Sequence, residues 1–299
     1  MTNTGEGRMT KHRALLYLAP AVVAATLSFA TASGAVELDP AAVAYVTPDQ
    51  FKWRDPTDRA ATNQVTLLGD PNKVGGLYIY INKFKPGRFG NPHYHPNDRF
   101  ITVIDGASWH GTGTVVDPAH AHRVTKGTFM IDHASKVHWG GNKDEGGSYL
   151  IAGIGPSSSV EVPKSSGPWA GGDPSAATVI PPDRIPWRDH GAFRVANLTG
   201  DPDKSGLFVQ MLMLPKGGAG FSRPHVHPGP LYTTVLSGTW WVGTGTKFDP
   251  DNLTVPIKEG PFVTHFGNRV HWDGAKDEDV TLVIIGEGPV TTVRVDETR

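Results

Sequence analysis

The sequence predicts an all-β protein made of two tandem jelly-roll barrels that are related by internal duplication. Three observations predict this fold: an ordered internal repeat, short strand-like runs in each copy, and abundant turn residues. Gly (36) and Pro (25) are scattered through the 299 residues, which favours many short strands joined by turns. After residue 35, no stretch of useful length has the periodicity of a helix.

The internal repeat predicts the domain organisation. Motifs recur in the same order at an offset of about 130 to 134 residues, among them Trp53-Arg54-Asp55 as Trp187-Arg188-Asp189, Pro92-His93 as Pro224-His225, and Val137-His138-Trp139 as Val270-His271-Trp272. A repeat of this length is a domain rather than one unit of a solenoid. We place the domains at residues 44–157 and 178–293, with a Ser/Pro/Gly-rich linker at 158–177.

Strand-like runs follow one another in the same order within each copy. They are short and rich in β-branched and aromatic residues, as strands are. The matched pairs of runs are 77–82 with 207–213, 100–104 with 232–236, 127–132 with 260–265, and 148–154 with 280–285.

The first 35 residues are typical of an export signal. A basic segment at 11–13 precedes a mostly apolar segment at 14–30, and small residues follow at 31–35. This pattern predicts a cleaved signal peptide and a periplasmic or secreted protein. An uncut membrane anchor is the alternative reading. No later segment reaches the roughly 18 apolar residues that a membrane span needs, so we expect no membrane partner after cleavage.

The amino-acid composition excludes several kinds of partner and reactive site. The formal net charge is −1 and no basic stripe is present, which argues against a nucleic-acid partner. The chain has 0 cysteines, so disulfides, thiolate metal sites and cysteine nucleophiles are excluded. Any metal must therefore be held by histidine and carboxylate side chains.

Two His-x-His pairs are candidate metal ligands. Side chains two apart on a strand point to the same face, so His93 with His95, and His225 with His227, can each aim two imidazoles at one point. A third ligand must come from another strand, and the candidates are His138 and His271. A third pair, His120 and His122, has no counterpart in the other copy, and we interpret it as surface.

These residues resemble the two motifs of the cupin superfamily. Gly87, His93, His95 and Gly106 match the first motif, as do His225, His227 and Gly238 in the second copy, while Gly127 with His138 and Gly260 with His271 match the second motif. The resemblance covers both copies and implies a two-domain cupin, or bicupin, whose barrels are double-stranded β-helices. It also implies His93, His95 and His138 as ligands in one copy, and His225, His227 and His271 in the other.

The chain departs from the family pattern at one ligand. Cupins with the full motif carry a Glu four or five residues after the second His, where this chain has Arg99 and Phe100, or Leu231 and Tyr232. The resemblance therefore favours three-histidine dioxygenases over oxalate-degrading cupins. Fe is the expected divalent metal, with Mn, Ni, Cu or Zn as alternatives.

Two further residues are candidates for a catalytic role. If strand parity holds past Pro96, Arg99 faces inward with the histidines and could bind a substrate carboxylate or enolate. His265 could carry a proton in the second copy, although His110, His133 and His265 are first interpreted as residues that support the ligands or the fold. The hypothesis is an exported Fe(II)-type dioxygenase acting on a small organic anion, as a monomer or homo-oligomer. A non-catalytic binding or sensor protein and a metal-assisted isomerase or lyase are the alternatives.

Overall fold

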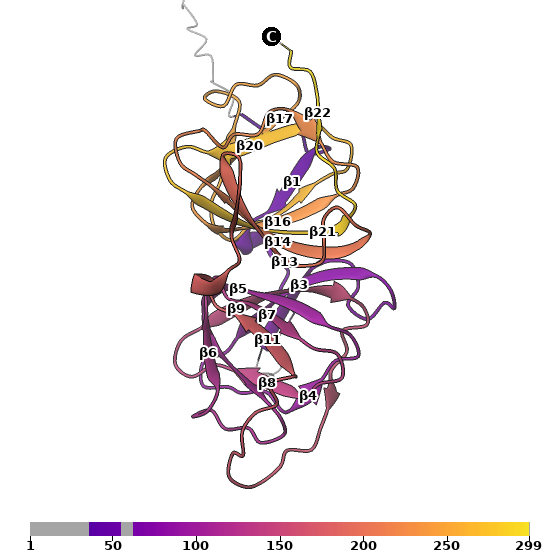
Figure 1. The fold of residues 1–299 in the computed structure, drawn as a ribbon, viewed down its shortest axis with the longest axis vertical. Coiled ribbons are helices and arrows are strands. Elements are labelled where there is room, and N and C mark those ends of the chain that lie inside the picture. Colours follow the sequence, from indigo (N-terminus) through magenta and orange to yellow (C-terminus); the bar gives the residue numbers. More distant parts are fainter. Residues whose placement is uncertain (1–35, 55–61, 299) are drawn as a thin grey trace, which may run out of the picture. The chain divides into compact units, whose positions relative to one another are not determined.

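The structure is a computed structural model, which describes residues 36–54 and 62–298. Nearly all regular structure in this part of the chain is β, and the strands curl into two barrels, which confirms the predicted fold class (Figure 1). No helix among these residues is long and apolar enough to span a membrane. The signal expected at 1–35 lies outside the described residues.

The first repeat forms one ten-stranded curled sheet. The 14-residue strand β5 makes this possible, because its first half pairs with β7 and β9 and its second half pairs with β6 and β8. The strands are β2 (Thr62–Leu68), β3 (Leu77–Phe84), β4 (His93–Tyr94), β5 (Arg99–Thr112), β6 (His122–Thr125), β7 (Phe129–Asp132), β8 (His138–Gly141), β9 (Gly147–Ile154), β10 (Val160–Glu161) and β11 (Ala177–Ile180).

The second repeat forms a seven-stranded and a five-stranded sheet. The chain turns between β16 and β17 at Gly238, which has a φ of 82° that favours glycine. The strands are β1 (Val43–Val46), β12 (Arg188–His190), β13 (Phe193–Thr199), β14 (Gly206–Leu214), β15 (His225–Val226), β16 (Leu231–Ser237), β17 (Trp240–Thr244), β18 (Val255–Ile257), β19 (Phe262–His265), β20 (His271–Ala275), β21 (Val280–Gly288) and β22 (Val293–Arg294).

The two repeats exchange a short strand. β1 opens the first repeat but pairs with β19 of the second, and Figure 1 shows it in indigo among the orange and yellow strands. β11 opens the second repeat but pairs with β7 of the first. Each exchanged strand leads into a single 3-10 turn, η1 (Pro48–Gln50) or η2 (Pro182–Arg184). The stretch expected to be a linker also carries β10, which pairs with β4.

Alternation along the strands separates the barrel interior from the layer shared by the two repeats. On β3, Tyr78 and Tyr80 belong to a buried cluster inside the first barrel. Their neighbours Ile79 and Ile81 belong instead to a cluster that also contains Val209 of β14. The period of two is that of a strand whose two faces are both buried. Residues on the tyrosine side of these strands therefore surround the interior where the histidines lie.

A glycine–tryptophan contact recurs beside the third histidine of each barrel. Gly111 pairs with Trp139, and Gly243 pairs with Trp272, directly after His138 and His271. A Cβ atom on Gly111 would lie 2.2 Å from the indole of Trp139, and one on Gly243 would lie 2.3 Å from that of Trp272. Both indoles are fully buried. Only glycine leaves room for the ring, so this contact supports the strand that carries the histidine.

We therefore expect Gly111→Ala to destabilise the protein by about 1–3 kcal/mol, because the added methyl overpacks the core against Trp139. Gly146→Ala is the matched control, since no atom lies within 4 Å of a Cβ at that position. Urea unfolding of the two variants measures the difference. Equal free energies of unfolding for both variants would contradict the packing role of Gly111.

Candidate metal centres

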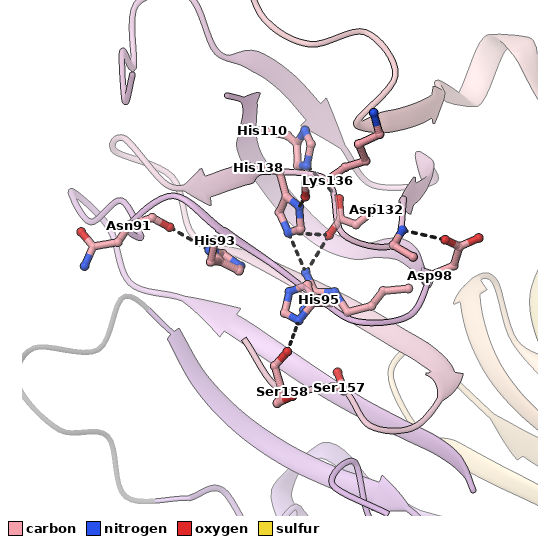
Figure 2. A network of polar contacts seen from close by, with 12 residues as sticks. Asn91, His93, His95, Asp98, His110, Asp132, Lys136, His138, Ser157 and Ser158 are labelled. Carbon is pink, nitrogen blue, oxygen red and sulfur yellow. Dashed lines mark hydrogen bonds and ion pairs between the residues drawn. The ribbon is translucent and has the colours of Figure 1, made fainter. Parts of the chain in front are cut away.

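The first candidate centre lies on neighbouring strands of barrel one. His93 on β4 pairs directly with His138 on β8, and His95 follows β4 on the same side. One ring nitrogen from each of the three lies within 4.8 Å of the others. His95 and His138 are buried, whereas His93 is partly exposed. The three imidazoles that the resemblance implied are thus brought together (Figure 2).

Backbone carbonyls orient these imidazoles. In each ring Nδ1 lies within hydrogen-bond distance of a carbonyl oxygen, which can only accept, so Nδ1 carries the proton and Nε2 keeps its lone pair. The Nε2 atom of His95 is buried and has no hydrogen-bond partner among the described residues, as expected of a ligand atom awaiting a metal. The accepting oxygens are those of Asn91 (2.7 Å from His93), Ser158 (3.0 Å from His95) and Lys136 (3.0 Å from His138).

Burial keeps the three histidines neutral. It lowers the pKa of His95 to about 2 and that of His138 to about 3, and it also lowers the pKa of His93. Nearby Arg99 acts in the same direction on all three. Neutral imidazole is the form that binds a transition metal, so the donor set fits such an ion.

A buried ion pair adjoins His138. Arg99 and Asp132 face each other on β5 and β7, and Arg99 Nη2 donates to Asp132 Oδ2 over 2.6 Å. His110 Nε2 lies 2.9 Å from the other oxygen of Asp132. Burial alone would raise the pKa of Asp132, but His138, Arg99 and His110 hold it well below its usual range. Asp132 is therefore a carboxylate that fixes Arg99 and His110 in place.

Arg99 reaches the metal histidines. Its Nη2 atom lies 3.4 Å from Nε2 of His138, and Asp132 Oδ2 lies 3.2 Å from the same nitrogen (Figure 2 shows Asp132 beside His138). Arg99 Nη1 donates to the hydroxyl of Tyr80 over 3.1 Å, while Arg99 Nε is buried without a partner among the described residues. A lone pair and a carboxylate oxygen this close repel unless a cation lies near both. The guanidinium supplies part of that charge, and a metal ion would supply more.

A cavity of about 740 Å³ opens onto this centre. Its size lies within the range of small-molecule sites. Its wall includes two of the three metal histidines and the ion pair, together with aromatic and amide side chains. The lining residues around the candidate centre are His93, Arg99, His110, Asp132, His138 and Tyr149. Barrel one therefore joins a metal-binding donor set, a fixed cation and space for a small molecule.

The second candidate centre repeats the histidines but not their surroundings. His225 on β15 pairs with His271 on β20, and both join His227 in a group whose ligand atoms lie within 4.8 Å of one another. All three are buried. Nδ1 of His225 lies 2.8 Å from the carbonyl oxygen of Arg223, and that of His271 lies 3.1 Å from that of Arg269. Burial lowers the pKa of His227 to about 4 and that of His271 to about 3.

Strand register shows what replaces the ion pair in barrel two. Leu231 pairs with His265 on β16 and β19, as Arg99 pairs with Asp132 on β5 and β7. By the same comparison the counterpart of His110 is Val242. A second cavity, of about 530 Å³, is lined by residues such as Phe221 and Phe248 and by none of the barrel-two histidines. The two centres therefore have the same three candidate histidine ligands, but the polar residues beside them differ.

The other histidines that the structure describes are not part of either group. His120 and His122 are exposed, and His120 is held by Asp117 (2.8 Å) and stacked on Trp169. His133 bonds the hydroxyl of Thr178. These placements agree with the surface or supporting roles expected of them.

Sequence reasoning missed Asp132 and Tyr80. Both act through Arg99, which lies 33 residues from Asp132 and 19 from Tyr80, so only the strand register brings them together. One signal was available for Asp132. It ends an otherwise apolar strand run, and a carboxylate buried in such a run must be paired.

Comparison with known proteins shows the fold. No family model and no curated protein matches the sequence, but solved cupin structures match the fold. Oxalate decarboxylase from Lactobacillus farciminis, in a formate complex, matches with a TM-score of 0.55 at 13% identity, covering 84% of this chain and 88% of that one. A cupin 2 conserved barrel domain protein from Leptotrichia buccalis matches with a TM-score of 0.53 at 16% identity, covering 78% and 92%. Procruciferin, an 11S globulin from Brassica napus, matches with a TM-score of 0.54 at 9% identity, covering 85% and 87%.

These matches and the two histidine groups fit a two-domain cupin. At such identities they show the fold and leave the function open, because cupin barrels serve both enzymes and storage proteins.

If both centres bind metal, His138→Ala and His271→Ala will each remove about half of the metal from the purified protein, because each variant destroys one donor set. Elemental analysis of the full chain measures this. His133→Ala is the control and should lose none. Loss of all metal in one of the two variants would show that a single barrel binds it.

The metal-free protein should lose stability as the pH falls from 6.5 towards 4. Because burial lowers the pKa of His95, His138, His227 and His271 from 6.5, the unfolded chain binds more protons than the folded chain in this range. Each such histidine contributes up to about 1.4 kcal/mol per pH unit.

Urea unfolding with a chelator at pH 7.5, 6 and 5 measures this loss, which a bound metal should reduce by competing with protons. Equal free energies of unfolding at pH 7.5 and pH 5 would contradict the prediction.

Proposed function

We propose that this two-domain cupin is an exported enzyme that uses Fe(II) in barrel one to oxidise a small organic anion with O₂. The observation that carries the proposal is Arg99, a buried cation fixed between the metal histidines and the wall of the cavity. Export is supported by the basic, apolar and small-residue pattern of the first 35 residues.

His93, His95 and His138 would hold the metal through Nε2, with Nδ1 bonded to backbone carbonyls. The metal would supply Lewis-acid and redox chemistry at the base of the cavity. The donor set suits Fe because neutral imidazoles are good ligands for it.

Arg99 would bind and orient the substrate anion. Nη1 donates to Tyr80 and Nη2 donates to Asp132, while the buried Nε–H has no partner among the described residues and could donate to a ligand oxygen. The hydroxyl of Tyr149, which lines the cavity, lies beside Ser108. A buried donor without an acceptor is costly, and an oxygen-bearing anion would satisfy the Nε–H of Arg99. Lys52, exposed at the cavity wall, adds positive charge that attracts such a ligand.

A binding or sensor protein without turnover is the second candidate, because storage globulins share this fold. A tightly bound small molecule that co-purifies and is not converted would favour it. A metal-assisted isomerase or lyase is the third, and His110 held by Asp132 at the cavity wall would be its proton carrier.

The chain itself offers the test variant. Arg99→Leu together with Asp132→His gives barrel one the pair that barrel two already carries at Leu231 and His265. We expect this double variant to fold and keep its metal, but to lose anion affinity by about 10- to 100-fold, since a charge-assisted hydrogen bond contributes about 1.5–3 kcal/mol. Anaerobic calorimetry with enolates, catechols and thiols measures affinity, and an oxygen electrode measures turnover of the Fe-loaded protein.

The Arg99→Lys variant tests whether the positive charge alone is enough for anion binding, because lysine keeps the charge but lacks the planar set of N–H donors of arginine. Unchanged affinity and turnover in the double variant would show that Arg99 does not bind the substrate. A wild-type protein that loads only Zn, or that loads Fe and consumes no O₂ with any of these anions, would overturn the dioxygenase proposal.

A further inference from the structure

One wall of the barrel-one cavity carries a pair of amide side chains. Gln64 on β2 lies opposite Asn82 on β3, and Gln64 Nε2 donates to Asn82 Oδ1 over 3.2 Å. Both residues line the cavity and are half-buried. Asn82 lies two residues along β3 from Tyr80, whose hydroxyl accepts from Arg99, so the two side chains are on the same face, roughly 6–7 Å apart along the strand. The amide pair therefore shares a wall of the cavity with the arginine.

The two amides keep one free acceptor and one free donor. Apart from the bond between them, Gln64 Oε1 and Asn82 Nδ2 make no hydrogen bond within the described part of the chain. A carbonyl oxygen can only accept, and an amide NH₂ group can only donate. A hydroxyl group both donates and accepts, so it can bond to both free atoms at once. A carboxylate can bond only to the donor, and a methylene group can bond to neither.

Hydroxyl groups are frequent along the rest of this wall. Ile151 is the only branched aliphatic residue among the described residues that line the cavity. Small-molecule sites are usually lined mostly by apolar side chains, with few polar groups. This lining therefore indicates a ligand that is polar along its length. The serine and threonine residues of the wall are Thr62, Thr66, Ser157 and Ser159.

Barrel two has an apolar pair where barrel one has the amides. Strand β2 and its counterpart β13 each have one register shift, which aligns the two copies. Two residues ahead of the residue at which the shift begins, Val195 pairs with Leu212, as Gln64 pairs with Asn82. Leu212 packs against a buried apolar cluster of barrel two. The fold accepts this apolar pair, so packing does not account for the amides in barrel one.

We propose that Gln64 and Asn82 form a hydroxyl-binding subsite, and that the anion of barrel one is a polyhydroxylated carboxylate of the sugar-acid class. Its carboxylate would accept from the Nε–H of Arg99. A hydroxyl group farther along the same molecule would donate to Gln64 Oε1 and accept from Asn82 Nδ2. The anion site at Arg99 is that of the proposed function, on which this assignment rests.

The test compares two probes, gluconate and hexanoate, which have the same number of carbons and differ in their hydroxyl groups. Calorimetry on the full chain loaded with Zn²⁺, an ion without redox chemistry, measures binding without turnover. We expect gluconate to bind at least about 10-fold more tightly than hexanoate, because a site built to bond a hydroxyl rejects an analogue that lacks it. Arg99→Leu should weaken the binding of both probes, since both carry the carboxylate.

The decisive variant takes its residues from barrel two. Gln64→Val together with Asn82→Leu should weaken gluconate binding by about 10- to 100-fold, through the loss of two hydrogen bonds, and should not weaken hexanoate binding. Urea unfolding checks that this variant is folded. Gln64→Met, which keeps the length of the side chain and removes its amide, should show the same selective loss.

Barrel two also offers a matched control. Its own amide pair, in which Gln210 Nε2 donates to Asn197 Oδ1 over 2.7 Å, lines neither of the two cavities. Asn197→Val together with Gln210→Leu should therefore bind gluconate as the wild type does. A loss in this control as large as that in the Gln64 and Asn82 variant would overturn the assignment to barrel one.

The outcomes separate the subsite from the reaction. A wild-type protein that binds gluconate no more tightly than hexanoate would overturn the subsite, and so would a folded variant without the amides of Gln64 and Asn82 that keeps its gluconate affinity. An Fe-loaded protein that prefers gluconate and consumes no O₂ would overturn the proposed reaction and support the subsite.

Discussion

The bond from a ligand imidazole to a nearby backbone carbonyl, which five of the six histidines make, is the constraint on which both centres depend. In four of the six histidines the carbonyl belongs to the residue two positions earlier: Asn91, Lys136, Arg223 and Arg269. Such a bond needs only the local strand conformation, so it recurs wherever the strand recurs. It fixes the tautomer and aims the Nε2 lone pair inward before any metal arrives. Duplication therefore copied the donor set with the backbone, and the surroundings were free to diverge.

The two barrels differ most at one pair of positions, where barrel one has an ion pair and barrel two has apolar packing. Arg99 and Asp132 are both nearly fully buried in barrel one, and burying two charges costs more than apolar residues of similar volume would. Barrel two shows that this fold accepts the apolar solution, since Leu231 occupies the position of Arg99 and is itself buried. Stability alone therefore does not account for the pair in barrel one. Its contact with His138 and with the cavity is the reason why we propose a binding role for it and assign the proposed reaction to barrel one.

The sequence predicted the parts of this structure that repeat. Motif order predicted two barrels. An inward-facing Arg99 was predicted on the condition that the histidine strand ran on past Pro96; the structure ends β4 at Tyr94, and Arg99 reaches His138 from the start of β5. The sequence could not predict the exchange of β1 and β11, because the two segments are alike and either barrel could pair with either one. It also missed the role of Asp132. The partners of that carboxylate come from different strands, and no spacing along one strand reveals a contact across the register. The bounds of the domains and the signal peptide stay predictions.

His265 shows why two copies are more informative than one. In a single barrel, a buried histidine beside a tryptophan would be interpreted as a core residue. The sequence analysis gave a proton carrier as the alternative. The ring of His265 packs against that of Trp240, with 5.2 Å between centroids, and its partner across the strand register is Leu231. The comparison with Asp132 adds what a single barrel could not: the position faces the metal group in both copies, but only in barrel one is its side chain satisfied by protein partners. Replacing a carboxylate, its arginine and its histidine by one imidazole and two aliphatic residues therefore leaves the buried Nε2 atom of His265 without a partner among the described residues.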